Sequence, residues 1–264
     1  MPHRQVIIIP QLSRALASAF PYCQAAFALF RLVDPDDHLS SSVLQSAKAR
    51  ELNDLEQAAL AAFKLPKRRA QWLTGRLCAK QAVIGYCQEH LPLLPLPAAN
   101  RIHIRNSPSG RPYLDCGRAD LNSLDISISH SGDYAIALVA SGPCGVDIQK
   151  DSGSLQRVRD HFCLDSETDL LQRCLPDLDH GRRLTLLWTA KEAVKKALSL
   201  EKMPGFLTLI LNRCHPDEEG LINFSLQQRV LDAAPASPQL SVLASRFQDY
   251  GISLSLPARG RIHA

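Results

Sequence analysis

The sequence predicts an α+β fold of two similar lobes, and a short internal repeat is the main observation behind that prediction. A segment of one expected helix, AKQAV at 79–83, recurs 111 residues later as AKEAV at 190–194. Each copy precedes a set of strand-like segments, which indicates a duplicated α+β half. The turn that contains Ser141 separates the halves, so we expect an N-terminal lobe at 1–141 and a C-terminal lobe at 142–264.

Composition and charge exclude several classes of protein. With 264 residues, 45% of them hydrophobic, the chain is long enough to bury a substantial core. A net charge of +4 favours an acidic partner or a phosphorylated ligand and is too small for a nucleic-acid-binding surface. The eight cysteines lack paired motifs, which indicates free thiols in a reducing compartment. No apolar run suits a membrane span or a signal peptide, so we expect a soluble cytoplasmic protein without a membrane partner.

The N-terminal lobe is expected to contain two helices and several strands. Residues 46–63 are rich in Ala, Leu and Glu, and residues 67–88 place apolar side chains at helical spacing after a basic start. Alternation marks the strands, as at 125–130, where isoleucines alternate with serines. The expected elements, in chain order, are a strand at 26–33, a turn at 34–37, helices at 46–63 and 67–88, a loop at 91–97, and strands at 101–105, 112–114, 125–130 and 134–140.

The C-terminal lobe is expected to combine one central helix with strands. In GVDIQ at 145–149, the valine and isoleucine face one way, whereas Asp147 and Gln149 face the other. Residues 1–24 contain no motif that predicts a role, and residues 259–264 are expected to form a loose tail. The other expected elements are a helix at 184–198, a helix-breaking Met-Pro-Gly at 203–205, and strands at 206–211, 221–228, 239–247 and 251–256.

The helix at 184–198 carries charges in places where a structural helix would have apolar side chains. Lys191 lies inside its apolar arc, and Glu192 and Lys196 lie one turn apart at the edge of that arc. The structural interpretation is a surface ion pair, with lysine stems passing along apolar neighbours. The functional interpretation joins Glu192 to Asp147, because carboxylate oxygens suit Mg²⁺ bound with substrate phosphates and lysines neutralise a transferred phosphoryl group.

Five stretches of the chain, in order, are similar to the signatures of one enzyme family. They are RRAQWLTGRLCAK, SGRPYL, ISISHSGDYAIALVA, GVDIQ and WTAKEAVKK. Over roughly residues 26–215, the sequence resembles the larger, two-lobed 4′-phosphopantetheinyl transferases of the surfactin-synthetase-activator-like type. The resemblance implies two α+β lobes related by pseudo-twofold symmetry, with the active site between them. We expect such a chain to act as a monomer.

The resemblance implies a reaction and a set of catalytic roles. The reaction transfers the phosphopantetheine arm of coenzyme A to a serine of an acyl or peptidyl carrier protein and releases 3′,5′-ADP. Asp147 and Glu192 would hold Mg²⁺ against the pyrophosphate, and Glu192 would take the serine proton or position the base that does. Lys196 and Lys191 would contact phosphate oxygens. Carriers of this type are acidic around the serine, which suits a mildly basic enzyme.

The resemblance also implies a set of residues that bind coenzyme A. Ser129 and His130 would contact its phosphates, and Arg111 stands where the family has a lysine. Two of these residues have a structural interpretation as well, since His130 could cap a turn and Arg111 could be an exposed turn residue. The candidates for the 3′-phosphate and adenylate side are Arg69, Arg76 and Lys80.

The sequence departs from the family pattern at two positions. Gln149 stands where many members carry a third metal-binding carboxylate, and Ser127 stands where asparagine is common. An amide oxygen is a poorer ligand than a carboxylate, so Gln149 would contact Mg²⁺ weakly or through a water. Two other functions therefore stay open. They are a Mg²⁺-dependent phosphohydrolase of nucleotide-like pyrophosphates and a non-catalytic module that binds carrier proteins.

Overall fold

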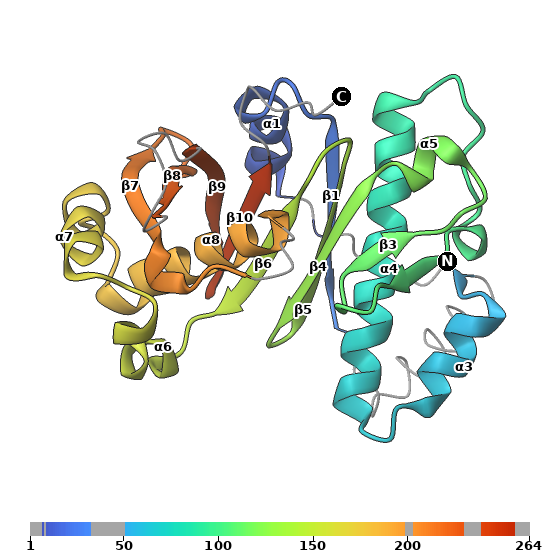
Figure 1. Ribbon diagram of the computed structural model, residues 1–264, viewed down its shortest axis with the longest axis horizontal. Helices are drawn as coiled ribbons and strands as arrows, with labels where there is room; N and C mark the ends of the chain where they lie inside the picture. Colours follow the sequence, from blue (N-terminus) through green and yellow to red (C-terminus); the bar gives the residue numbers. More distant parts are fainter. Residues whose placement is uncertain (1–6, 8, 33–50, 199–202, 230–238, 257–264) are drawn as a thin grey trace. The chain divides into compact units, whose positions relative to one another are not determined.

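Two units, each combining helices with an antiparallel sheet, make up the chain, as expected for an α+β protein (Figure 1). The first unit consists of Met1–Ile8 and Gln24–Ser141, and the second of Ile9–Cys23 and Gly142–Ala264. Residues 9–23 therefore pack with the C-terminal part of the chain, which corrects their assignment to the N-terminal lobe. The computed structural model describes residues 7, 9–32, 51–198, 203–229 and 239–256.

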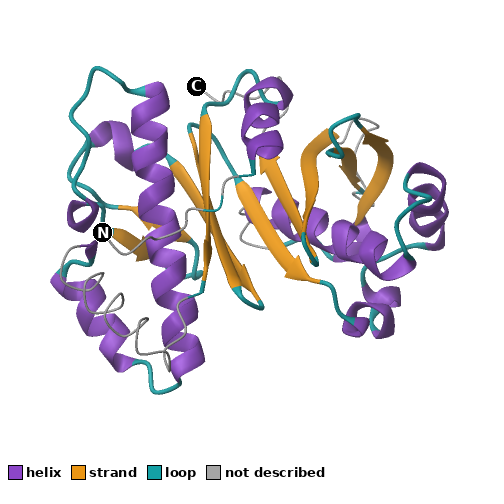
Figure 2. Ribbon diagram, turned by 180° about the vertical axis from the view of Figure 1, so that it is seen from behind, coloured by secondary structure: helices purple, strands orange, loops and turns teal. Residues whose placement is uncertain are grey.

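The first unit is built on a three-stranded sheet that one long helix covers. The strand order is β1-β5-β4, with β1 at Ala25–Arg31, β5 at Tyr134–Ala140 and β4 at Asp125–Ser131. Helix α4, Pro66–His90, lies along the sheet and packs on β1 and β5, as Figure 2 shows from behind. All residues of β5 are buried, because this strand lies between two others and beneath α4. Burial on both faces explains its continuously apolar sequence.

A capping box interrupts the helix that we expected at 46–63. Within the described residues, which begin here at 51, helix α3 spans Asp54–Ala62. The Asn53 side chain accepts a hydrogen bond from the Glu56 N–H at 2.9 Å, and the Glu56 carboxylate accepts one from the Asn53 N–H at 3.2 Å. These two bonds start a new helix at Asn53, where the Ala-, Leu- and Glu-rich composition predicts an uninterrupted one.

The remaining elements of the first unit are short and lie after α4 in the chain. The expected strand at 101–105 begins with a 3₁₀ turn, and its second half pairs antiparallel with the strand expected at 112–114. The turn between them is closed by a hydrogen bond from the Ser107 N–H to the Arg111 carbonyl at 2.8 Å. The elements are η1 (Ala99–Arg101), β2 (Ile104–Asn106), β3 (Pro112–Leu114) and α5 (Ala119–Asn122).

The second unit is built on a five-stranded antiparallel sheet. The strand order is β6-β10-β9-β8-β7, and helix α8, His180–Leu198, packs on β6, β10 and β9. The apolar faces of α8 and of this sheet form the core of the unit, which includes Leu187, Val194 and Phe224. The strands are β6 (Gly145–Lys150), β7 (Leu209–Pro216), β8 (Ile222–Gln228), β9 (Gln239–Phe247) and β10 (Tyr250–Leu256).

The second unit also contains short helices that the sequence patterns did not predict. The expected strand at 206–211 begins with one of them, a 3₁₀ turn. The expected turn at 34–37 and the tail at 259–264 lie outside the described residues. No helix in the described ranges has an apolar stretch long enough to cross a bilayer. The short helices are α1 (Pro10–Ala19), α6 (Gly153–Arg157), η2 (Arg159–His161), α7 (Asp165–Cys174) and η3 (Phe206–Thr208).

Candidate active site

Gly145 brings the start of strand β6 against the backbone of helix α8. A Cβ atom at this position would lie 1.9 Å from the Ala193 carbonyl oxygen and 2.7 Å from the Ala197 nitrogen. Only glycine leaves room for so close a contact between two main chains. Because side chains two apart on a strand share a face, Asp147 and Gln149 project from the same face as Gly145, toward α8. The sequence GVD therefore places the Asp147 carboxylate on the side of β6 that faces α8.

Asp147 and Lys196 meet at this junction. The Lys196 Nζ donates a hydrogen bond to Asp147 Oδ1 at 2.8 Å and another to the Val146 carbonyl at 2.9 Å. The Asp147 residue is only 6% exposed. A buried carboxylate requires a cation or hydrogen-bond donors nearby, and Lys196 supplies both. The structure therefore joins two residues that the sequence patterns predicted to act together.

Glu192 lies on the same helix, one turn before Lys196, and is electrostatically coupled to Asp147. Burial raises the pKa of Glu192, the Asp147 carboxylate raises it further, and Lys196 and Lys195 act in the opposite direction. Among the described residues, no hydrogen bond or ion pair occupies the Glu192 carboxylate. The Asp147 and Glu192 carboxylates thus share one half-buried site. A cation bound there would reduce the repulsion between their charges.

The side chains at the junction of β6 and α8 suit Mg²⁺ better than a transition metal. Within the described ranges, no group of three or more His, Cys, Asp or Glu side chains is arranged to hold a metal ion. Mg²⁺ commonly takes one or two protein carboxylates and fills its other positions with waters and substrate phosphates. Gln149 lies two residues after Asp147 on the same face of β6, and its Nε2 donates to the Lys150 carbonyl at 3.1 Å. Asp147 and Glu192 are therefore the residues that would hold the ion.

Lys191 lies away from this place, although it precedes Glu192 in the chain. Its side chain is fully buried, and its Nζ donates to Glu167 Oε2 at 2.8 Å and to the Phe162 carbonyl at 2.8 Å. Burial lowers the pKa of Lys191, and Glu167 opposes that shift. An ammonium group held in this way has a structural role, so we do not retain the predicted contact between Lys191 and a phosphate.

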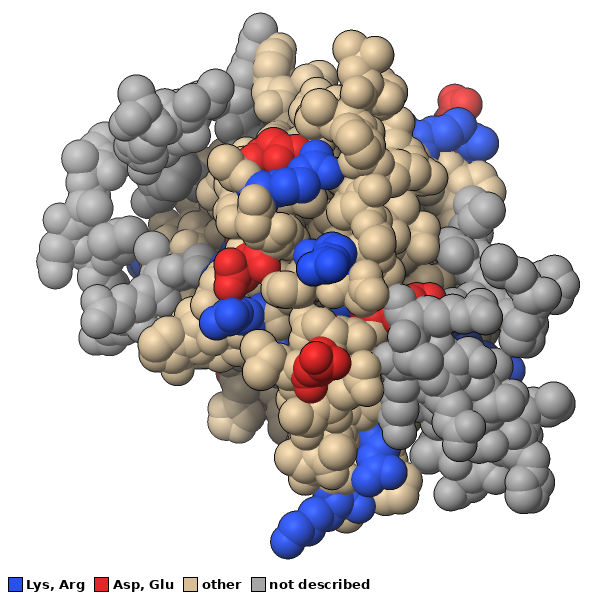
Figure 3. All heavy atoms as spheres, turned by 90° about the vertical axis from the view of Figure 1, so that its right-hand side faces the viewer, with Lys and Arg blue, Asp and Glu red and all other residues tan. Residues whose placement is uncertain are grey.

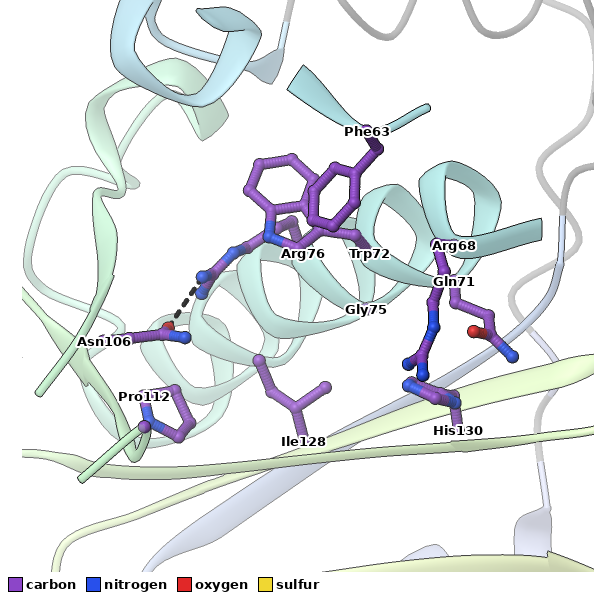
Figure 4. A pocket seen from close by; sticks show the side chains of 11 residues that line it. Phe63, Arg68, Gln71, Trp72, Gly75, Arg76, Asn106, Pro112, Ile128 and His130 are labelled. Atoms are coloured by element: carbon purple, nitrogen blue, oxygen red, sulfur yellow. Dashed lines mark hydrogen bonds between the residues drawn. The ribbon is translucent and has the colours of Figure 1, made fainter. Parts of the chain in front are cut away.

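A cavity of about 310 Å³ lies in the first unit and gathers cationic and aromatic side chains (Figure 4). Arg68, Trp72 and Arg76 reach it from one face of α4, and His130 reaches it from the end of β4. Phe63, whose ring centroid lies 5.8 Å from that of Trp72, completes the aromatic side. Two guanidinium groups, an imidazole and two aromatic rings suit an anionic ligand with a planar ring.

Arg76 has one hydrogen-bond donor group without a protein partner in this cavity. Its Nη2 donates to Asn106 Oδ1 at 2.8 Å, and its guanidinium lies 5.1 Å from the centroid of the Trp72 ring. Its Nη1 is buried and has no hydrogen-bond partner among the described residues. Burial lowers the pKa of Arg76, and Glu56 opposes this effect. A buried donor of this kind is stabilised by a bound anion.

Arg68 lines the cavity, whereas its neighbour Arg69, the predicted ligand, does not. Arg69 is half-buried and donates from Nη2 to the Phe63 carbonyl at 2.9 Å. Arg68 is exposed and lines the cavity with Trp72 and Arg76. A signal for Arg68 was available in the sequence, because positions 68, 72 and 76 are spaced by four residues and therefore share a helical face, whereas position 69 is turned by 100°.

The other predicted ligands of coenzyme A have protein partners in the first unit. Lys80 is buried, and its Nζ lies 2.5 Å from Glu56 Oε2, so its predicted contact with the 3′-phosphate is not retained. Arg111 is half-buried and forms an ion pair with Asp125, although its neighbours in sequence line the cavity. Ser129, predicted to contact phosphate, is buried on β4 and precedes His130. Arg111, Ser129 and His130 stay predicted ligands.

Comparison with known proteins finds similarity in the second unit. Residues 143–254, which contain the junction of β6 and α8, match the 4′-phosphopantetheinyl transferase superfamily. The matched segment is less than half of the chain. Enterobactin synthase component D of Escherichia coli strain K12 is 37% identical over 84 residues, and that of Shigella flexneri is 35% identical over 83. Each alignment covers 31% of this chain and 39% of the relative, so the chain matches about two fifths of their length.

Two solved structures also resemble part of the chain. The Chronobacterium ammoniagenes ACPS-CoA complex is 23% identical with a TM-score of 0.36, and covers 45% of this chain and 95% of that chain. The holo-ACP-synthase of Plasmodium yoelii is 18% identical with a TM-score of 0.35, and covers 44% of this chain and 91% of that chain.

Proposed function

We propose that this protein transfers the 4′-phosphopantetheine arm of coenzyme A to a serine of an apo acyl or peptidyl carrier protein. The observation that carries the proposal is the arrangement of Asp147, Glu192 and Lys196 at the junction of β6 and α8. This arrangement lies within the segment that matches the transferase superfamily. Two neighbouring carboxylates and an ammonium group thus lie in a segment that matches a family of phosphopantetheinyl transferases.

The proposed step exchanges a phosphoanhydride bond for a phosphate ester bond. The serine Oγ of the carrier bonds to the phosphorus that bears the pantetheine arm. The bond from that phosphorus to the bridging oxygen of the pyrophosphate breaks, and 3′,5′-ADP leaves. Glu192 accepts the serine proton, and its partly buried position makes it a stronger base than an exposed glutamate. Lys196 balances negative charge near the transferred group.

Asp147 and Glu192 would hold Mg²⁺, which when bound would supply positive charge for the pyrophosphate. The donor set supports the proposal, because two neighbouring carboxylates with waters are a usual protein contribution to a Mg²⁺ site. We keep Gln149 as a contact through water, since its amide nitrogen is already bound to the Lys150 carbonyl. This role predicts a weaker Mg²⁺ site than one with a third carboxylate.

We propose that the cavity of the first unit receives the 3′-phosphoadenosine end of coenzyme A. Arg76, Arg68 and His130 would contact the 3′-phosphate or the pyrophosphate, and Trp72 and Phe63 would contact the adenine. The buried Nη1 of Arg76, which lacks a partner among the described residues, supports this assignment. A phosphate oxygen in the cavity would satisfy that donor.

The remaining proposals concern the partner and the compartment. An acidic carrier suits a chain of net charge +4, through faster association more than through affinity. On the face drawn in Figure 3, Lys and Arg alternate with Asp and Glu over the described residues, which does not favour a nucleic-acid partner. All eight cysteines are free thiols, which supports a reducing compartment such as the cytoplasm. We keep the monomer as the proposed state.

The decisive experiment measures the intact mass of a carrier protein. Purified apo acyl and peptidyl carriers are incubated with the protein, coenzyme A and Mg²⁺, and we expect each true substrate to gain one phosphopantetheine group. The gain should disappear with EDTA and when the acceptor serine is replaced by alanine. Coenzyme A breakdown without a carrier would instead indicate a phosphohydrolase. Carrier binding without any mass change across a panel of carriers would indicate a binding module.

A further inference from the structure

Lys191 and Glu167 form a buried ion pair that connects four segments of the second unit. Besides the carboxylate, the Lys191 ammonium contacts the carbonyls of Phe162 and Phe206, at 2.8 Å and 3.2 Å. Glu167 is also fully buried and accepts from the backbone N–H groups of Leu164 and Leu211, at 2.8 Å and 2.7 Å. The pair therefore fastens α8 to the start of α7, to η3 and to β7. We call it the Lys191 clasp.

Aromatic packing reinforces the same connection. The Trp188 ring, one turn before Lys191 on α8, stacks on Phe206 with ring centroids 4.7 Å apart. It meets Phe162 edge to face at 5.1 Å. Phe162 and Phe206 are the residues whose carbonyls accept from Lys191. Polar and apolar contacts thus hold the same turn of α8 to the same two segments.

The first unit contains a clasp with the same sequence spacing. The Lys80 Nζ donates to Glu56 Oε2 at 2.5 Å and to the carbonyls of Glu51 and Ala99, at 2.7 Å and 3.0 Å. In both clasps the glutamate lies 24 residues from the lysine and the first carbonyl lies 29 residues from it. In both, the glutamate also accepts a hydrogen bond from the main-chain N–H of the residue before its short helix, Asn53 or Leu164. The repeat in the sequence therefore encodes a repeated buried ion pair.

The two clasps differ in the residue that comes after the lysine. Lys80 precedes Gln81, whereas Lys191 precedes Glu192. The Lys191 clasp is also more completely bonded, since Glu56 Oε1 is buried without a partner among the described residues, whereas Glu167 Oε1 accepts from Leu211. The more complete clasp thus stands next to the acid that the second unit needs at the junction with β6.

Fixing Lys191 fixes the rotation and the axial position of α8 at that turn. Successive residues are 100° apart around a helix. Fixing the direction of the Lys191 side chain therefore also fixes the direction in which Glu192 points. A displacement of about 1 Å at a reacting group can cost on the order of 100-fold in rate. The contact of Gly145 with Ala193 sets the distance from α8 to β6. The clasp adds contacts that constrain the rotation of α8.

We propose that the Lys191–Glu167 clasp positions the Glu192 carboxylate against Asp147 and so sets the strength of Mg²⁺ binding. Lys191 is a positioning residue in this proposal and contacts no substrate. The proposal rests on the proposed function for the identity of the ion and of the reaction. The effect on the geometry of α8 and β6 does not depend on that function.

The test replaces each clasp by a neutral pair. Removing one partner would leave a buried charge, so the variants are Lys191→Met/Glu167→Gln and, as the matched control in the first unit, Lys80→Met/Glu56→Gln. Circular dichroism checks that both fold. If the first pair of substitutions prevents folding, Lys191→Arg, which keeps the charge opposite Glu167 but changes the geometry of the clasp, replaces it.

The test has three readouts, and one of them needs no activity. Hydrogen exchange of peptides that cover 145–150 and 190–198 should be faster in Lys191→Met/Glu167→Gln and unchanged in the control. The Mg²⁺ concentration that gives half-maximal transfer should rise about tenfold to a hundredfold, with KM for the carrier within about twofold of wild type. The control should leave the Mg²⁺ requirement unchanged, whatever it does to KM for coenzyme A.

Unchanged exchange at 145–150 and 190–198, or an equal rise in the Mg²⁺ requirement in both variants, would overturn the proposal. The failure of the proposed function looks different, because the wild-type protein would then modify no carrier. In that case the exchange measurement alone still decides whether the clasp positions α8 against β6.

Discussion

Lys191 and Lys196 lie on the same helix, yet the structure gives them different partners. Lys196 bonds to Asp147 at the candidate active site, and Lys191 bonds to Glu167 in the core. Helical spacing placed Glu192 and Lys196 side by side, the GVD pattern placed Asp147 on a polar strand face, and the family resemblance grouped the three. It could not separate Lys191 from them, because Glu167 lies outside any local pattern.

Glu192→Gln is the residue-scale prediction for catalysis. The amide keeps the size of the side chain but can neither hold Mg²⁺ as a carboxylate does nor accept the serine proton, so we expect transfer to fall by at least about 100-fold. Coenzyme A binding in the first unit should persist, as isothermal titration can measure. Transfer at a rate close to that of the wild type would refute the role given to Glu192.

The same variant should be at least as stable as the wild type at neutral pH without Mg²⁺. Burial and Asp147 raise the pKa of Glu192 above its unfolded value. A raised pKa means that the carboxyl favours folding when protonated, and that this contribution is lost as the pH rises through the folded-state pKa. Glutamine lacks the charge, so the melting-temperature difference in favour of the variant should grow from acidic to neutral pH. The difference in stability between the variant and the wild type should favour the variant more at pH 7 than at pH 4. The opposite trend would contradict this account.

At the scale of elements, the close contact of β6 with α8 defines the site. Alternation and helical periodicity predicted β6 and α8 from the sequence, with only the ends of the elements displaced. Neither α6 and α7 nor the break in the helix expected at 46–63 was predicted from the sequence. Composition cannot locate such breaks, because a capping box depends on two side chains that turn back on the main chain.

Gly145→Ala tests the contact between these two elements. Its Cβ would overlap the Ala193 carbonyl oxygen, so we expect a loss of about 1–3 kcal/mol of stability and a larger fractional loss of transfer than of coenzyme A binding. Gly153→Ala is the matched control, since no atom lies within 4 Å of its added Cβ. Chemical denaturation measures both. Equal stability of the two variants would show that β6 can move away from α8 at little cost.

At the scale of the whole molecule, each unit contains charged side chains with a structural role and charged side chains in a candidate functional site. The first unit places Lys80 in a clasp and Arg76 in a cavity, and the second places Lys191 in a clasp and Lys196 beside Asp147. Sequence spacing suggested the duplication, but nothing in it indicated that residues 9–23 pack with the second unit. That association depends on α1 reaching β9, a contact between distant parts of the chain.

Arg76→Leu tests the part played by the first unit. Leucine keeps the packing on Trp72 but removes the donors, so KM for coenzyme A should rise about tenfold to a hundredfold while kcat changes little. Arg69→Leu, on the helix face that avoids the cavity, should change KM by much less. A fall in kcat by as large a factor as the rise in KM would show that Arg76 acts on the reacting groups.

The contact at Gly145 makes the separation of β6 from α8 a property of the main chain. Strand β6 contacts the main chain of α8 directly at Gly145. The distance between these two elements therefore does not change when core side chains are exchanged for others of similar size. Variants of the apolar face of α8 should therefore lose thermal stability well before they lose the spacing of β6 and α8. For protein engineering, the apolar core of the second unit is thus open to redesign, whereas substitution of Gly145 should cost both stability and transfer.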